Sequence, residues 1–338
     1  MTPRAGIAGT GFIARVHAGV LRSLGIELVG VYSRGGSTEL GVPAYRSLDD
    51  LFAEEHVDVL HVCTPNVLHA EQTLAALERG VHVICEKPLA VSSDESARMV
   101  AAAEAARRVG ATCFHVRGYP LVERMRTAVA AGDLGGVRVV HGRYFCDDAV
   151  RMLGGWRLEP ELAGRSYVTA DLGAHWLDAA EHVAGQRVAA VLAEFHRFAG
   201  GPLEDDAMLL LRFDGGAVGS VRLSALAAGR KNQLLLELEG DRGGLTWDQE
   251  RPDELLQRFP EEPTRVVVKD EGPLALYPAG HAEGYGEAFR NVLGAVYAAI
   301  AGEPQAPFPT FEDGHRNVRL IEAAVASAGS GGWVEIGR

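Results

Sequence analysis

The 338-residue sequence is short of several features that mark particular classes of protein. It has no apolar run of the roughly 20 residues needed to cross a bilayer. Lys and Arg number 33 against 45 Asp and Glu, and the resulting charge of −12 disfavours binding to nucleic acid phosphates. The sequence therefore predicts no membrane and no nucleic acid partner. The strand predicted almost at the first residue leaves no room for a signal peptide, so we expect the cytoplasm.

Cysteine is also scarce. The four cysteines are Cys63, Cys85, Cys113 and Cys146, and none belongs to a CxxC pair, so neither a zinc ribbon nor a thioredoxin motif is indicated. Three of them end successive strand-like runs, which a parallel sheet would bring together, so a metal cluster is one interpretation. The interpretation we favour is four small buried apolar side chains in a reducing compartment.

What the first third of the chain does have is a regular alternation of short β-branched runs and longer helical runs. This alternation predicts a parallel sheet covered on both faces. After about residue 120, strand-like runs follow one another across Gly-rich turns, with helices expected at about 170–184, 283–301 and 310–328. We therefore predict an α/β domain with a doubly wound Rossmann sheet over residues 1–118. An α+β domain with an open, mostly antiparallel sheet is predicted over residues 119–338.

A glycine pattern, "GTGFIA", lies between the first predicted strand and the first predicted helix. Gly9 allows a tight turn, and Gly11 lets the backbone approach a pyrophosphate at the helix N-terminus. With Ala14 in the third position, the stretch fits GxGxxA, and its place in an alternating α/β run predicts dinucleotide binding.

The end of the second predicted strand bears on which dinucleotide binds. An NAD-selective loop usually carries an acidic residue there, but this sequence has Ser33 and Arg34. A guanidinium and a hydroxyl can bind a 2′-phosphate, so NADP is favoured. The alternative is that Arg34 only stacks on adenine and that NAD is the cofactor.

The stretch "VHVICEKPLAV" places Lys87 just past the end of a buried strand, where ligands of open parallel sheets bind. Pro88 favours an extended backbone at Lys87, and the bond between them has access to the cis form. Lys87 is therefore either a functional residue or a solvated lysine paired with Glu86.

A later stretch, "ADLGAHWLDAAEH", puts Asp171, His175, Asp178 and His182 on one stripe of a helix. Three interpretations are open. The residues can bind a metal, Asp171 can orient His175 as a general acid/base, or the stripe is a solvated face.

Taken in order, these motifs resemble the glucose–fructose oxidoreductase/inositol dehydrogenase/MocA (Gfo/Idh/MocA) family of NAD(P)-dependent oxidoreductases. The matching stretches include "GTGFIARVHAGVL", "VCTPNVLHAEQTLAALERGVHVICEKPLAVSSDES", "GRSYVTADLGAHWLD", "HAEGYGEAFRNVLGAVYAAI" and "FPTFEDGHRNVRLIEA", and they span nearly the whole chain. The resemblance implies hydride transfer at a secondary carbinol of a sugar, cyclitol or related polyol. It also implies an open sheet that often makes oligomer contacts, so a homo-oligomer, dimer or tetramer, is expected.

The resemblance assigns roles to residues by motif. Lys87, Asp171 and His175 are expected to be catalytic, with either Lys87 or His175 accepting the proton. The expected cofactor contacts are Gly9, Thr10, Gly11, Phe12, Ile13, Ser33, Arg34, Thr64, Pro65, Asn66, His69, Glu86 and Lys87. The expected substrate contacts are Lys87, Arg117, Trp156, Arg157, Asp171, His175 and Tyr285. For Arg117, Trp156, Arg157 and Tyr285, ordinary packing is the competing interpretation.

One departure from the family pattern concerns the substrate. Arg165 and Ser166 stand where many relatives have glycines, which leaves the particular substrate open. Two other classes of function remain as alternatives. One is a dinucleotide-binding regulator or sensor without turnover. The other is a metal-dependent lyase or hydrolase using Asp171, His175 and His182, although no metal is expected.

Overall fold

The computed structural model describes residues 3–151, 155–304 and 306–337. It divides into two compact units. The first unit contains the chain up to Phe114 together with Phe289–Val318, and the second contains His115–Ala288 together with the chain from Arg319 onward. In the part of the chain that the structure describes, no helix is long and apolar enough to span a membrane.

The first unit is built on a six-stranded sheet of order β3-β2-β1-β4-β5-β6. Every pairing in it is parallel. The strands are β1 (Arg4–Ala8), β2 (Glu27–Tyr32), β3 (Ala44–Tyr45), β4 (Val59–Val62), β5 (His82–Cys85) and β6 (Gly110–Thr112). The order reverses between β1 and β4, as in a Rossmann sheet, so the predicted fold class of this part is confirmed.

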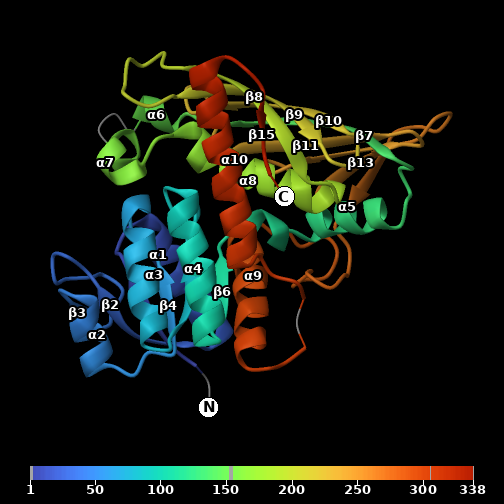
Figure 1. Cartoon of the computed structure of the whole chain (residues 1–338). Coiled ribbons are helices and arrows are strands. Elements are labelled where there is room, and N and C mark those ends of the chain that lie inside the picture. The colour runs from blue at the N-terminus through green and yellow to red at the C-terminus, as the bar shows by residue number, and fades with distance from the viewer. Residues whose placement is uncertain (1–2, 152–154, 305, 338) are drawn as a thin grey trace. The chain divides into compact units, whose positions relative to one another are not determined.

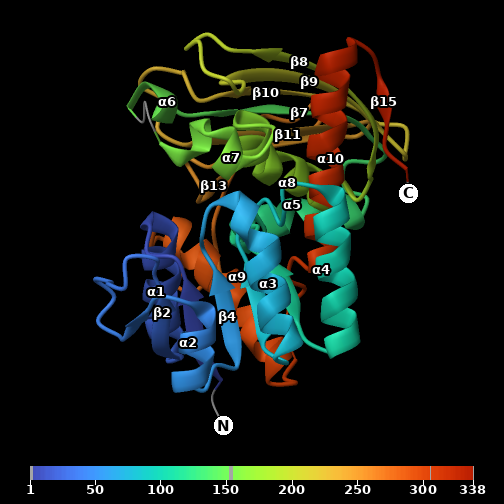
Figure 2. The same ribbon diagram turned by 60° about the vertical axis from the view of Figure 1, so that its left-hand side comes forward.

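Helices connect these strands as the alternation predicted. They are α1 (Phe12–Leu24), α2 (Leu48–Glu54), the short η1 (Asn66–Leu68), α3 (His69–Glu78) and α4 (Ser93–Ala106). Ser47, followed by Asp49 and Asp50 in the sequence, predicts an N-cap for α2. This cap is confirmed, because the Ser47 Oγ accepts a hydrogen bond from the Asp50 N–H at 3.0 Å. Helices α3 and α4 lie side by side in both views (Figures 1 and 2).

Residues 289–318, far along the chain, group with the first unit by their contacts. They include most of α9 (Tyr285–Ile300) and the first part of α10 (Phe311–Ser330). The Thr112 N–H donates to the Pro309 carbonyl, and the Phe311 ring fills the space over Gly110. The contact-based division therefore differs from the predicted one at residue 118, while the functional division into residues 1–118 and 119–338 stays a prediction.

The second unit contains a nine-stranded sheet of order β14-β13-β12-β11-β7-β10-β9-β8-β15. Its strands are β7 (Val137–Phe145), β8 (Val188–His196), β9 (Asp206–Phe213), β10 (Val218–Ser224), β11 (Gln233–Gly240), β12 (Gly244–Asp248), β13 (Glu254–Arg258), β14 (Arg265–Val268) and β15 (Val334–Glu335). All neighbours are antiparallel except β7 and β10, which are parallel. The predicted open, mostly antiparallel sheet is confirmed.

Helix α8 (Ala174–Ala184) lies against β7 and β11 and packs on α5 (Pro120–Ala130) (Figure 2). Trp176 of α8 is fully buried, and its Nε1–H donates to the Leu235 carbonyl at 2.9 Å. The shorter helical segments of this unit are η2 (His115–Gly118), α6 (Asp148–Arg151), η3 (Trp156–Leu158), α7 (Pro160–Ala163) and η4 (Thr169–Gly173).

Two local expectations need correction. The strand predicted over residues 111–116 ends at Thr112, and the chain turns into η2 at His115. The helix predicted from about residue 170 starts with the π-helical turn η4 before α8 begins. A π turn is uncommon and often marks a functional site, and periodicity alone does not reveal one.

Candidate functional site

The glycine loop follows β1 directly and leads into α1. Gly9 has a φ of +112°, and an added Cβ would lie 2.5 Å from the Cys63 carbonyl oxygen at the end of β4, so only glycine fits. Gly11 is the N-cap residue of α1, and a Cβ there would meet nothing within 4 Å. The N-terminus of α1 therefore faces open space with no side-chain cap, which fits a dinucleotide pyrophosphate.

Three arginines without carboxylate partners come from neighbouring segments: Arg15 lies on α1, Arg34 in the loop after β2, and Arg46 directly after β3. Arg15, Arg34 and Arg46 are exposed, and among the described residues no ion pair occupies any of them. The Arg46 guanidinium lies along Gly36, at the tip of this loop. A cavity of about 360 Å³ next to the glycine loop is lined by Thr10, Arg15, Ser37, Thr38, Glu39 and Leu40. The predicted Ser33 is buried, with its N–H donating to the Tyr45 carbonyl at 2.8 Å.

His69 joins the turns that follow β4 and β5. Its Nδ1 lies 2.8 Å from the Pro88 carbonyl oxygen, and its Nε2 lies 2.9 Å from that of Thr64. The side chain is almost fully buried, and burial lowers its pKa. The Thr64 Oγ1 also donates to Gln72 at 2.7 Å. His69 thus holds the predicted Thr64–Asn66 turn, and its own contact with a cofactor stays a prediction.

Glu86 and Lys87 follow β5 with different exposures. Lys87 is half-buried and its bond to Pro88 is cis, whereas Glu86 is buried. Burial opposes ionisation of the Glu86 carboxyl, but the hydrogen bond from His17 and the charges of His17 and Lys87 outweigh it, so its pKa lies below its usual value. Glu86 is therefore a buried carboxylate directly before Lys87.

In the second unit, the π turn η4 carries Asp171 and the first turn of α8 carries His175. The Arg157 Nε lies 3.3 Å from an Asp171 oxygen, and this carboxylate raises the pKa of Arg157. The Arg157 guanidinium also lies over the Trp156 ring, 4.9 Å from its centroid. The structure thus brings three predicted substrate contacts, Trp156, Arg157 and Asp171, into one group.

His175 belongs to a second group of rings. The His115 ring meets it edge to face at 4.6 Å between centroids, and the Tyr285 ring lies 4.8 Å from His115 on the other side. Tyr144 approaches His175 at 6.3 Å. Imidazole and phenol groups beside an Asp and an Arg can bind hydroxyl groups and move a proton.

The chain before η4 is held by a buried carboxylate that the sequence did not reveal. Glu204 accepts hydrogen bonds from the Ser166 hydroxyl at 2.5 Å, from the Tyr167 N–H at 3.1 Å and from the Thr169 N–H at 3.0 Å. Burial raises the pKa of Glu204 even though these bonds oppose the shift. Ser166, noted as a departure from the family pattern, is thus part of the support of Asp171.

The rest of the polar stripe on α8 is explained by ion pairs. Arg117 forms a bidentate ion pair with Asp178, with Nε donating to Oδ2 at 2.9 Å and Nη2 donating to Oδ1 at 2.5 Å. The His182 Nε2 lies 4.0 Å from the Glu123 Oε2. These contacts account for Asp178 and His182 without a metal. The substrate contact predicted for Arg117 stays a prediction, but its guanidinium is already engaged in a structural pair.

Three of the four cysteines, Cys63, Cys85 and Cys113, lie at the ends of the neighbouring strands β4, β5 and β6, and all four are buried and free of disulfides. Burial raises the pKa of each thiol, that of Cys146 to about 12. They match the predicted role of small buried side chains.

Comparison with known proteins follows the same division of the chain. Residues 3–114 match the family model described as an oxidoreductase family with an NAD-binding Rossmann fold, and residues 122–246 match the GFO/IDH/MocA C-terminal domain. The chain belongs to the Gfo/Idh/MocA family of oxidoreductases. The resemblance drawn from the motifs is confirmed, and the chain is an enzyme of this class.

Three relatives match over nearly their whole length. The 1,5-anhydro-D-fructose reductase of Ensifer adhaerens is 32% identical, over 98% of both chains. An inositol dehydrogenase homologue from Azotobacter vinelandii, solved with NAD⁺, is 30% identical over 99% of this chain and 97% of its own, with a TM-score of 0.92. A levoglucosan dehydrogenase solved with NADH is 27% identical over the full length of both chains, with a TM-score of 0.93. The alternative of a sensor without turnover gains no support from these relatives.

We expect Glu204→Ala to lower the free energy of unfolding by about 2–4 kcal/mol, because it leaves the Tyr167 and Thr169 N–H groups buried without an acceptor. Denaturant unfolding followed by tryptophan fluorescence measures this. The control is Glu194→Ala on β8, a mostly exposed carboxylate expected to change stability by less than about 0.5 kcal/mol. Equal effects of the two changes would contradict the role given to Glu204.

Proposed function

We propose that the protein transfers a hydride between nicotinamide and a secondary hydroxyl or ketone of a sugar, cyclitol or related polyol. The observation that carries this proposal is the glycine loop at the N-terminus of α1. Because Gly9 has no side chain, the backbone after β4 can pack against it, and the space beside Gly11 is open for a pyrophosphate. Support for the substrate class comes from the relatives described above, an inositol dehydrogenase homologue, a levoglucosan dehydrogenase and a 1,5-anhydro-D-fructose reductase.

The cofactor contacts follow from the residues already described. The α1 N-terminus and the backbone of Thr10, Gly11, Phe12 and Ile13 would hold the pyrophosphate, and the turn Thr64–Asn66 and the segment Glu86–Lys87 would hold the nicotinamide end. When bound, the nicotinamide supplies the acceptor or donor of the hydride. The protein supplies orientation and a place for the proton.

Side chains of the protein would accept or donate the proton. Oxidation of a carbinol removes a hydride from carbon and a proton from oxygen, and the proton needs a base. We propose that Lys87 and His175, the latter supported by Asp171, are the catalytic residues. Arg157 would hold the Asp171 carboxylate, and Trp156 and Tyr285 would bind the C–H faces of a ring. Either Lys87 or His175 accepts the proton.

We also propose a preference for NADP over NAD. The support is the three arginines around the loop after β2, Arg15, Arg34 and Arg46, in a chain with an overall charge of −12. Most of the other arginines that the structure describes are paired with carboxylates or carbonyls. Three exposed guanidinium groups on α1, in the loop after β2 and directly after β3 suit an anionic 2′-phosphate.

We also propose that the protein is cytoplasmic. We further propose that it assembles into a homo-oligomer. The face of the nine-stranded sheet that α8 does not cover exposes Met208 and Leu210 of β9, whose alternate neighbours Leu209 and Leu211 are buried. Val218 of β10 is also exposed. A second copy covering this face would remove these apolar groups from water.

Lys87→Met and His175→Asn should each lower kcat at least about 100-fold, because a positioned proton-transfer group contributes roughly 10²–10⁴. The assay is absorbance at 340 nm with NAD and with NADP across inositols, levoglucosan, 1,5-anhydro sugars, free sugars and glycosides. His56→Asn, at an exposed histidine, is the control expected to keep full activity. A Lys87→Met enzyme with full turnover would contradict the role of this lysine.

Arg34→Ala should raise the KM for NADP about tenfold and leave that for NAD almost unchanged, since one lost phosphate contact is worth roughly 1.4 kcal/mol. Arg98→Ala, at an exposed arginine of α4, is the matched control. If NAD is preferred by the unmodified enzyme and Arg34→Ala affects both cofactors equally, the preference for NADP is wrong.

Leu210→Lys should shift the mass in light scattering from an oligomer towards a monomer, because it places a charge in the proposed interface. Val150→Lys, at an exposed apolar residue of α6, should leave the mass unchanged. A monomeric unmodified protein at micromolar concentration would contradict the proposed assembly.

A further inference from the structure

A line of buried polar side chains in the first unit ends at Glu86, and its other three members have no part in the reaction as proposed above. It runs from Tyr297 on α9 through His61 on β4 and His17 on α1 to Glu86 after β5. His61 Nε2 lies 2.8 Å from the Tyr297 hydroxyl, His61 Nδ1 lies 2.8 Å from His17 Nδ1, and His17 Nε2 lies 3.0 Å from Glu86 Oε1. The two histidines are fully buried, and the two end residues nearly so.

The protons on this line are constrained by its ends. An ionised carboxylate only accepts hydrogen bonds, so the His17 Nε2–H must donate to Glu86. If His17 is neutral, its Nδ1 accepts from the His61 Nδ1–H, and the Tyr297 hydroxyl donates to His61 Nε2. If His17 is charged, the directions beyond it reverse. In both arrangements, the contact with His61 fixes which nitrogen of His17 faces Glu86.

The same carboxylate also holds the backbone at Lys87. Its second oxygen, Oε2, accepts a hydrogen bond from the Lys87 N–H at 3.2 Å. Loss of the donor on Oε1 would leave a buried carboxylate with less support and would free it to turn away from this N–H.

We infer that His17, His61 and Tyr297 are positioning residues for Lys87, acting through the buried Glu86 carboxylate. This inference rests on the proposed role of Lys87 in hydride transfer. It adds to the site three residues from α1, β4 and α9, none of which was assigned a role from the sequence.

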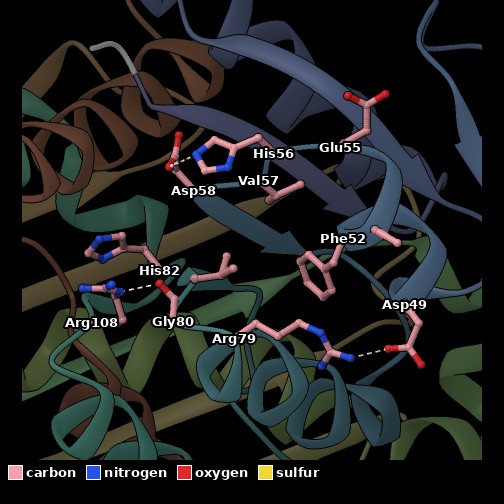
Figure 3. A pocket seen from close by; sticks show the side chains of 12 residues that line it. Asp49, Phe52, Glu55, His56, Val57, Asp58, Arg79, Gly80, His82 and Arg108 are labelled. Atoms are coloured by element: carbon pink, nitrogen blue, oxygen red, sulfur yellow. Dashed lines mark hydrogen bonds and ion pairs between the residues drawn. The ribbon is translucent and has the colours of Figure 1, made fainter.

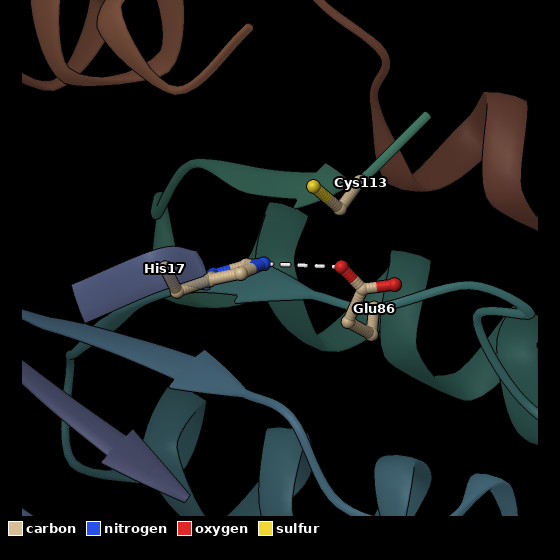
Figure 4. A group of neighbouring side chains, drawn as sticks. All are labelled: His17, Glu86 and Cys113. Atoms are coloured by element: carbon tan, nitrogen blue, oxygen red, sulfur yellow. Dashed lines mark hydrogen bonds and ion pairs between the residues drawn. The ribbon is translucent and has the colours of Figure 1, made fainter. Parts of the chain in front are cut away.

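Other groups surround Glu86. The titratable or charged side chains that act on it or respond to its charge are His17, Cys63, His69, Cys85, Lys87 and Cys113. The donor atoms of His17, Glu86 and Cys113 lie within 4.8 Å of one another (Figure 4). A metal ion there would need the two atoms that the hydrogen bond between His17 and Glu86 already uses, so we assign the group to hydrogen bonding.

The test compares two changes at His17. His17→Gln keeps an N–H donor near the position of Nε2, whereas His17→Leu removes it. With the substrate that turns over in the 340 nm screen, His17→Leu should lower kcat about tenfold and move the acid limb of kcat/KM up by roughly one pH unit. The direction follows because Glu86 then protonates at a higher pH. His17→Gln should restore most of kcat, and Tyr297→Phe should have a smaller effect than His17→Leu.

A second measurement does not depend on folding of a variant or on activity. Histidine ¹⁵N NMR of the unmodified protein should show a proton on His17 Nε2, and an unprotonated Nε2 would overturn the inference. Stoichiometric metal in protein purified without chelator, lost in Cys113→Ser, would also overturn it. If Lys87→Met is inactive but His17→Leu keeps the unmodified pH profile, the positioning role alone is wrong. If Lys87→Met is fully active, the proposed role of Lys87 is wrong, and the inference that rests on it is wrong as well.

Discussion

The need to stabilise a buried negative charge organises the first unit. Glu86 follows β5 inside the protein, and an ionised carboxylate there is stable only if hydrogen-bond donors meet it. His17 supplies one donor from α1, and the Lys87 backbone supplies another from the next residue. Because His17 is itself held by His61 and Tyr297, this one requirement connects a strand, two helices and the turn that carries Lys87.

A second buried carboxylate has the same effect in the second unit. Glu204 accepts hydrogen bonds from the backbone N–H groups of Tyr167 and Thr169, at the start of the π turn that carries Asp171. Surface cavities contrast with these clusters. The 740 Å³ cavity between α2 and β5 is rich in charged side chains, but its cations are already satisfied, Arg79 by Asp49 and Arg108 by the Gly80 carbonyl (Figure 3).

The sequence predicted the fold class because the fold class depends on local patterns. Alternating strands and helices, the glycine loop and the cap at Ser47 are all short-range signals. The grouping of residues 289–318 with the first unit was not predictable, since it depends on contacts such as that of Tyr297 with His61, which are 236 positions apart. Arg117 shows the same limit, because its partner Asp178 lies 61 positions further along the chain, while its predicted substrate contact stays a prediction.

The Lys87 motif and the Asp171–His175 spacing could be recognised in the sequence because each pattern lies within a few consecutive residues. The buried supports, His17, His61 and Glu204, could not, because each acts through a partner distant in the sequence. One signal for His17 was available in the sequence. It is a polar residue among the apolar positions of α1 that are buried, within the stretch "GTGFIARVHAGVL".

The most direct test of hydride transfer is to follow the hydrogen itself. A substrate from the 340 nm screen, carrying deuterium at its secondary carbinol carbon, is incubated with the enzyme and the oxidised cofactor. The account predicts one deuterium at C4 of the reduced nicotinamide by mass spectrometry and NMR, and a rate of transfer sharply reduced in Lys87→Met. Oxidation of the sugar without deuterium in the nicotinamide would contradict it.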